Sequence, residues 1–272
     1  MPKFWILVIA ILAIIHSITC FQPQSISKTR SGYVSMIFGG RGGQSTKSGE
    51  VIISITSDRA DVRRAADFLS YAMYEDVPKA QRRELSELEA KDLRTRYEEK
   101  VGKSRLPSAL ILAKEDEEII GSVGLDCQVF NKRTNKFRPL KKNEKLSDFL
   151  DKSNPQELVP VLANLAVRKD KRGLGLARTL LSSAEDIVKA WDYPVLYLLV
   201  DSQNVPAQKL YTSNGYKTAF TDEFATCVVS GQYNLQTQEC INLCLTKRLS
   251  GTSASEEMPT SFGDIFNLFF KK

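Results

Sequence analysis

The amino-acid sequence predicts an α/β fold, in which strands alternate with helices that pack on a sheet. Two segments carry this prediction. An apolar run ends at Val167 and is followed by a charged turn, a loop with two glycines and an amphipathic helix that starts at Leu176. A second, nearly continuous apolar run covers residues 195–200. Such a run is typical of a strand that is covered on both faces, so helices are expected on both sides of the sheet.

The folded part is expected to begin with a strand at 51–55. A helix follows, with Asp58 or Asp61 as its N-cap, because an aspartate carboxylate can accept the free N–H groups of a first turn. Residues 79–100 predict a highly charged helix with a narrow apolar stripe. The apolar positions at helical spacing are Val62, Ala65, Ala66, Leu69 and Met73 in the first helix and Leu85, Leu88 and Leu93 in the second.

The rest of the chain is interpreted in the same way. The expected elements are strands at 109–113 and 119–125, a strand ending at Val167, a helix at 176–191, a strand at 195–200, a short helix and a last strand at 241–249. The short helix has Asn204 as N-cap and Gly215 as its C-terminal stop. Residues 131–157 and 221–240 are expected to be long connections, which often have functional roles.

The loop before Leu176 has the features of an anion site. The first N–H groups of a helix are free, and the positive end of the helix dipole lies behind them. Two glycines allow phosphate oxygens to approach the backbone without a Cβ in the way. A dinucleotide fingerprint would need a third glycine where Arg178 stands, and Asp201 supplies its acidic residue only loosely. The Gly-Lys-Ser triplet at 102–104 has Tyr97 where a Walker loop needs its first glycine, so it does not predict such a loop. The loop is therefore predicted to hold a pyrophosphate; a tight turn without a ligand is the alternative.

The segment Arg172-Gly173-Leu174-Gly175-Leu176-Ala177 resembles the acetyl-CoA loop of the GNAT acyltransferase superfamily, Arg/Gln-x-x-Gly-x-Gly/Ala. The next strand, Asn204, a helix with Leu210-Tyr211, and Gly215-Tyr216 follow in the order of that superfamily. The resemblance implies an N-acetyltransferase (GNAT) domain over 51–249. Its fold would be a mixed, mostly antiparallel sheet with a splayed central strand pair flanked by helices. It also implies an N-acetyltransferase that moves an acetyl group from acetyl-CoA to a primary amine.

The resemblance also implies roles for individual residues. Tyr211 would be the general acid that protonates the CoA sulfur, with a core aromatic as the alternative role. The residues expected to bind acetyl-CoA are Leu165, Ala166, Val167, Arg172, Gly173, Leu174, Gly175, Leu176, Ala177 and Asn204. The only histidine is His16, so a carboxylate base is expected. Glu157 and Asp126 are candidates, and spacing favours neither.

Composition limits the other functions. No Cys-x-x-Cys pair occurs and the single histidine lies near the N-terminus, so no metal site is expected. Beyond residue 49 the chain has 33 basic and 32 acidic residues, so its charge does not indicate a nucleic-acid partner. The basic insertion at 131–157 favours a protein N-terminus or a lysine side chain over polyamines as acceptor. A small-molecule amine acetyltransferase and a non-catalytic module that binds CoA or a partner remain alternatives.

The terminal segments predict targeting. Residues 1–20 have the apolar run of a signal peptide, and residues 21–49 lack acids, as in a transit peptide. Together they resemble the two-part presequence of complex plastids, entered through the secretory route. Secretion or an endomembrane lumen is the alternative. The tail 250–272 is expected to be partly disordered. A membrane contact would require an uncleaved leader or the aromatic residues of this tail. The oligomeric state is left open.

Overall fold

The computed structural model describes residues 34–36, 50–75, 77–98, 106–141, 144–149, 151, 153–231 and 234–249. The predicted signal peptide, most of the predicted presequence and the tail 250–272 lie outside the described residues. The strands are β1 (Val34–Met36), β2 (Val51–Thr56), β3 (Ser108–Glu115), β4 (Glu118–Asn131), β5 (Lys136–Arg138), β6 (Gln156–Val167), β7 (Val195–Asp201), β8 (Lys217–Ser230) and β9 (Leu235–Arg248). The helices are α2 (Arg59–Ala72), α3 (Lys79–Tyr97), α4 (Leu176–Ala190) and α5 (Val205–Ser213), with short 3-10 turns at Leu146–Phe149 and Lys169–Lys171.

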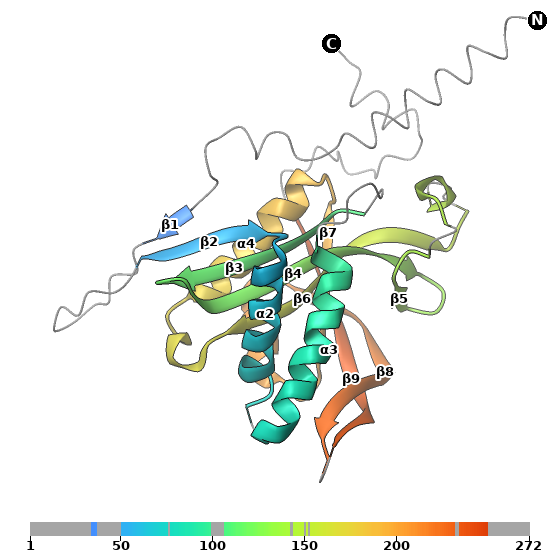
Figure 1. Cartoon of the computed structure of the whole chain (residues 1–272). Coiled ribbons are helices and arrows are strands. Elements are labelled where there is room, and N and C mark those ends of the chain that lie inside the picture. The colour runs from blue at the N-terminus through green and yellow to red at the C-terminus, as the bar shows by residue number, and fades with distance from the viewer. Residues whose placement is uncertain are drawn as a thin grey trace, which may run out of the picture.

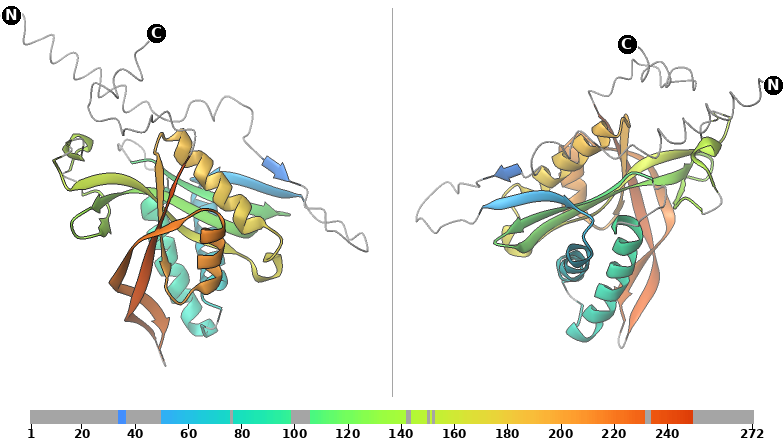
Figure 2. Two further views of the ribbon diagram at one scale, coloured as in Figure 1. Left: turned by 180° about the vertical axis from the view of Figure 1, so that it is seen from behind. Right: turned by 45° about the horizontal axis from the view of Figure 1, so that its top comes forward.

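The strands form one sheet in the order β1-β2-β3-β4-β6-β7-β9-β8, with β5 paired to β4. Among the described strands only β6 and β7 pair in parallel, so the sheet is mixed and mostly antiparallel. Helices α2 and α3 cover one face and α4 and α5 the other (Figures 1 and 2). The expected fold is confirmed. No described helix is both long and apolar enough to span a membrane.

Capping residues set several helix ends as the sequence predicted. The carboxylate of Asp58 accepts the N–H groups of Ala60 and Asp61 at 2.9 and 3.0 Å, so Asp58 is the N-cap of α2. The side chain of Asn204 accepts the N–H of Ala207 at 3.1 Å and caps α5. At the other end of α5, Gly215 has a φ of 88°, the left-handed conformation in which a glycine ends a helix.

Two expectations about the elements were wrong. Residues 221–240 are not a connection, because most of them belong to the long β8–β9 hairpin. Polar and apolar residues alternate there, as on a strand with a solvated face, whereas a buried strand would show a continuous apolar run. Leu88 is 48% exposed, so the apolar stripe of α3 does not include it. The buried side of α3 consists of Gln81, Leu85, Ser86, Ala90, Leu93 and Tyr97.

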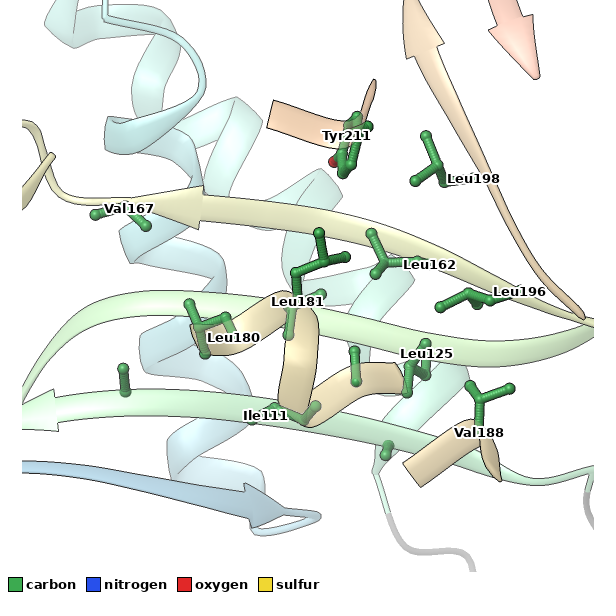
Figure 3. Packing of buried hydrophobic residues seen from close by; sticks show 14 of the residues in the cluster. Ile111, Leu125, Leu162, Val167, Leu180, Leu181, Val188, Leu196, Leu198 and Tyr211 are labelled. Atoms are coloured by element: carbon green, nitrogen blue, oxygen red, sulfur yellow. The ribbon is translucent and has the colours of Figure 1, made fainter. Parts of the chain in front are cut away.

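The two largest of three apolar clusters lie on opposite faces of the sheet. The larger lies under α4 and α5 and includes Leu125, Leu162, Leu180 and Leu198 (Figure 3). The smaller lies under α2 and α3 and contains Tyr97, whose hydroxyl is sealed from solvent without a hydrogen-bond partner in the described part of the chain.

Gly124→Ala is expected to destabilise the fold by about 1–3 kcal/mol, the usual effect of overpacking a core. A Cβ on Gly124 would lie 2.8 Å from Cζ of Tyr97 and even closer to its hydroxyl oxygen. Urea denaturation of Gly124→Ala, Tyr97→Phe and the double variant measures this effect. Removal of the unpaired hydroxyl should be neutral or stabilising alone and should recover part of the loss in the double variant. Strictly additive effects would show that the hydroxyl is not the obstacle.

Candidate functional site

The central strands separate at their ends. Strand β6 pairs with β7 only at Val161↔Tyr197 and Leu162↔Leu198, although both strands continue beyond these pairs. A bulge in β6 accompanies the separation: residues 164 and 165 lie between the pairs that β6 makes with Gly124 and Ser122. Asn164 has a φ of 56°, and its carbonyl accepts the hydroxyl of Ser122 at 3.1 Å. The β7-facing edge of β6 from residue 163 to 167 therefore lacks a strand partner.

The glycine loop connects the end of β6 to α4. Gly173 and Gly175 have φ values of 78° and 89°, and a Cβ at either position would meet no atom within 4 Å. The N–H groups of Arg178 and Thr179 donate to the carbonyl of Gly175 at 3.0 and 3.1 Å. The N–H groups of residues 173–177 have no acceptor in the described part of the chain. The loop thus combines open space with free donors and the positive end of the α4 dipole, the features that an anionic group requires.

The guanidinium of Arg172 binds protein groups on both sides of the loop. It donates to the carbonyls of Val167 and Ala72 at 2.9 and 3.0 Å and pairs with Glu75 at 2.6 Å. Lys169 contacts the other oxygen of Glu75 at 2.9 Å. Hydrogen bonds from Lys169 and Arg172 keep the pKa of Glu75 below its usual range. Arg172 therefore anchors the loop to the end of α2, and its guanidinium is bound to protein groups.

A cavity of about 660 Å³ lies against this anchor, between α2, the β3–β4 turn and the residues that follow β6. Phe68, Tyr71 and Ile119 line its apolar part. Tyr211 and the glycines of the loop do not line it. The cavity is therefore separate from the opening between β6 and β7.

Tyr211 lies in the opening between β6 and β7 (Figure 3). It belongs to the cluster under α4 and α5 and is 7% exposed. Its hydroxyl has no hydrogen-bond partner within the described residues. The hydroxyl still contacts solvent, because among the described residues only the Tyr97 hydroxyl is both fully buried and without a partner. Burial raises the pKa of Tyr211 to about 12, so the phenol stays protonated at physiological pH. The pKa values of a free tyrosine and a free thiol differ by about two units, and the raised pKa of Tyr211 widens this difference.

Tyr211 packs on a buried cluster of Tyr216, Glu185 and Lys247, which the sequence spacing did not predict. The ring of Tyr211 packs edge-to-face against Tyr216, with centroids 5.8 Å apart. The hydroxyl of Tyr216 donates to Glu185 at 3.1 Å, and Lys247 contacts both oxygens of Glu185 at 2.8 and 2.7 Å. Glu185 is 8% exposed. A buried carboxylate needs such partners, so this group fixes the orientation of the Tyr216 ring and, through it, of Tyr211.

Both carboxylates considered as bases are bound to cations. Asp126 pairs with Arg96 at 3.1 Å and accepts hydrogen bonds from Gln128. Burial raises the pKa of Asp126, while Arg96 and Gln128 oppose that shift. Glu157 pairs with Lys132 at 2.7 Å and lies near the start of β6, far along the strand from its separated end. Neither carboxylate is free beside the opening.

The 131–157 insertion borders the α2/α3 face of the sheet beyond α3. Its residue Phe137 stacks on Phe130 with centroids 4.8 Å apart, in an aromatic cluster with Tyr197 and Phe220. Its cations are partly neutralised: Lys132 pairs with Glu157, and Lys136 pairs with Asp222 of β8 at 2.6 Å. Glu144 holds Arg138 with both oxygens. The field of the insertion is therefore weaker than its sequence suggests.

Next to this cluster the same face of the sheet is open. We call it the open strip: Leu199, Asp201, Asp222, Cys240 and Asn242. Residues 196, 198 and 200 of β7 are buried on the α4/α5 side, so the alternate residues face the other way. Leu199 is 40% exposed although β7 is an inner strand. No group of His, Cys, Asp or Glu suited to a metal occurs in the described part of the chain.

A glycine loop with free donors, beside two strands that separate around a phenol, suits an anionic ligand and a polarised carbonyl. It is the arrangement that the resemblance to the GNAT superfamily implies for transferases that hold a thioester of CoA. Residues 71–216, more than half of the chain, match the sequence model of the acetyltransferase (GNAT) family. The chain belongs to this family of acetyl-CoA-dependent acetyltransferases.

Known proteins resemble the chain over part or most of its length. A curated relative, "GCN5-related N-acetyltransferase 4, chloroplastic" of Arabidopsis thaliana, is 31% identical over 85 residues, 30% of this chain and 29% of that protein. A probable acetyltransferase of Staphylococcus epidermidis covers 74% of this chain and 99% of its own (TM-score 0.49, 12% identity). The ribosomal-protein-S18-alanine N-acetyltransferase of Escherichia coli covers 76% and 98% (TM-score 0.45, 15% identity).

Proposed function

We propose that the protein transfers the acetyl group of acetyl-CoA to a primary amine, at a protein N-terminus or a lysine side chain. One observation carries the proposal: free N–H groups of the glycine loop lie beside a strand pair that separates around Tyr211. The free donors fit a pyrophosphate, and the unpaired edge of β6 fits the amide groups of a pantetheine arm. Leu165, Ala166 and Val167 would supply that edge, and residues 173–177 the donors.

The proposed division of labour follows from where each group lies. Backbone N–H groups at the bulge of β6 would polarise the thioester carbonyl. Tyr211 would donate its proton to the sulfur as the carbon–sulfur bond breaks. Its raised pKa keeps that proton available, and the same burial raises the basicity of a thiolate beside it. The side-chain oxygen of Asn204 caps α5, so only the side-chain NH2 group of Asn204 remains to bind acetyl-CoA.

The shape of the surface on which we expect the acceptor to bind supports a macromolecular amine as acceptor. The open strip is a partly exposed sheet surface with the exposed Leu199 at one end, rather than an enclosed pocket, and it suits a chain end or an extended side chain. A small-molecule amine remains the alternative acceptor, since the pairing of Lys132 and Lys136 weakens the field that would repel polyamines. The third alternative, a module that binds CoA without turnover, is distinguished by measuring turnover.

The test uses the full chain with acetyl-CoA and a peptide library whose members carry a free N-terminus, a free lysine or neither. Thiol release and mass spectrometry of the peptides measure transfer. We expect acetylation of one class of free amine and none of the doubly blocked peptides. CoA binding without transfer to any peptide would favour the non-catalytic alternative, and transfer to spermidine alone would favour a small-molecule acceptor.

We also propose that the protein acts in a plastid. The acid-free stretch 21–49 behind an apolar leader supports this location, and the relative from Arabidopsis thaliana is named as chloroplastic. N-terminal sequencing of the native protein is expected to find a start between Phe21 and Glu50. An intact Met1, or a secreted product that starts at Phe21, would contradict the proposal.

A further inference from the structure

The open strip contains a carboxylate without a cationic partner. Asp201 is the last residue of β7, three positions beyond the last pair that β7 makes with β6. Within the described residues, Asp201 forms no ion pair. Asp126, Glu157 and Asp222 all do. Asp201 is therefore the carboxylate beside the separated strands that is free to receive a cation.

The neighbours of Asp201 place its side chain on the open strip. In the register of β7, β9 and β8, Asp201 lies opposite Asn242, and Asn242 lies opposite Asp222. Burial raises the pKa of the Cys240 thiol to about 11, and the charges of Asp201 and Asp222 contribute to the shift. All four groups thus share one face of the sheet. The amide of Asn242 separates the two carboxylates, and Lys136 neutralises only Asp222.

Asp201 is also held firmly in place. Its Oδ1 accepts the N–H of Gln203 at 2.8 Å, while Oδ2 accepts nothing from the described part of the chain. The carbonyls of Asp201 and Ser202 both accept the side-chain amide of Gln208, at 3.1 and 2.8 Å. Gln208 belongs to α5, the helix that carries Tyr211. One helix therefore positions the phenol on one side of the opening and the free carboxylate oxygen on the other.

We propose that Asp201 binds the ammonium group of the acceptor and takes its proton, directly or through one water molecule. The inference rests on the proposed function. The neutral nitrogen then forms its bond to the acetyl carbon from the open strip. The bond from that carbon to sulfur breaks on the side of Tyr211, which gives the sulfur its proton. The nitrogen releases its second proton to solvent as the amide forms, Tyr211 recovers a proton from solvent, and Asp201 releases the proton that it took. One acetyl group therefore moves from sulfur to nitrogen, and one proton leaves in total.

The reaction benefits from a proton acceptor and a proton donor on opposite sides of the acetyl carbon. The nucleophile approaches the carbonyl carbon from the α2/α3 face, and the leaving sulfur needs its acid elsewhere. Tyr211 belongs to the cluster on the α4/α5 face, whereas Asp201 faces the open strip. The two groups therefore serve the two proton transfers without competing for the same atoms.

Asp201→Asn tests the proposal, because asparagine keeps the shape and the acceptor for Gln203. At pH 7 about a tenth of a protein N-terminus with a pKa near 8 is already neutral, so we expect kcat/KM to fall by about 10- to 100-fold. The deficit should shrink between pH 7 and 9 as the amine loses its proton without help. Calorimetry should give an unchanged affinity for CoA. Asp201→Glu should restore part of the rate.

Asp186→Asn is the matched control, since it removes an aspartate carboxylate that lies on α4, outside the open strip, and pairs with Lys189, and its kcat/KM should stay near that of the wild type. A rate of Asp201→Asn equal to the wild type, or a deficit that does not change with pH, would overturn the role of Asp201. Wild-type protein that transfers acetyl to no amine would instead overturn the proposed function.

Discussion

Gly175→Asp is expected to weaken CoA binding by at least about 100-fold while the fold survives, a loss of about 2.7 kcal/mol. Two effects add. The φ of 89° at Gly175 costs a residue with a side chain about 1–2 kcal/mol, and the free loop avoids this cost by moving away from the conformation that binds CoA. A carboxylate about 4 Å from a phosphate adds about 1–4 kcal/mol of repulsion, according to how much solvent separates them. The protein should tolerate the side chain, because a Cβ at Gly175 meets nothing within 4 Å.

Gly175→Asn separates these effects. Asparagine has the shape of aspartate and the same backbone requirement, but no charge. Calorimetric titration of the two variants with CoA therefore isolates the repulsion as the difference between their affinities. Thermal unfolding of both should differ little, which shows that the loop and not the fold has changed. Equal CoA affinities for wild type and Gly175→Asp would mean that the loop holds no pyrophosphate.

The parts of the fold that were predicted correctly depend on local signals. The apolar run to Val167, the glycine loop and the N-cap Asn204 each restrict a few neighbouring residues, and the structure contains the strand, loop and helices that they predicted. The separation of β6 from β7 was expected only through the resemblance to the GNAT superfamily. Its physical sign, the positive φ of Asn164 at the bulge, is a property of the folded backbone that the sequence pattern does not display.

The parts that were missed depend on contacts between distant segments. The β8–β9 hairpin alternates polar and apolar residues on a solvated surface, so it resembled a connection. Glu185 and Lys247 are 62 positions apart, and nothing in the sequence pattern indicates that they contact each other in the fold. Asp201 was noticed only as a weak match to a dinucleotide motif. Its importance comes from the cations that bind the other carboxylates and leave it free, which a linear sequence does not reveal.

Tyr211→Phe is expected to lower kcat by about 10- to 1,000-fold, within or just below the usual range for a general acid. The hydroxyl of Tyr211 has no protein partner in the described part of the chain, so its removal should leave stability and CoA affinity almost unchanged. The raised pKa of about 12 gives a second expectation. Tyr211 stays protonated below about pH 11, so any decline of the wild-type rate between pH 8 and 10 must come from another group.

Tyr216→Phe is the matched control, because it also removes one tyrosine hydroxyl from the same cluster. Here the hydroxyl is bonded to the buried Glu185, so its loss should cost about 1–3 kcal/mol of stability. The ring that packs on Tyr211 remains, and kcat should therefore change far less than in Tyr211→Phe. Single-turnover rates and urea denaturation of both variants give the comparison. A Tyr211→Phe protein with full turnover would leave Tyr211 a packing role, whereas loss of kcat without loss of stability requires its proton.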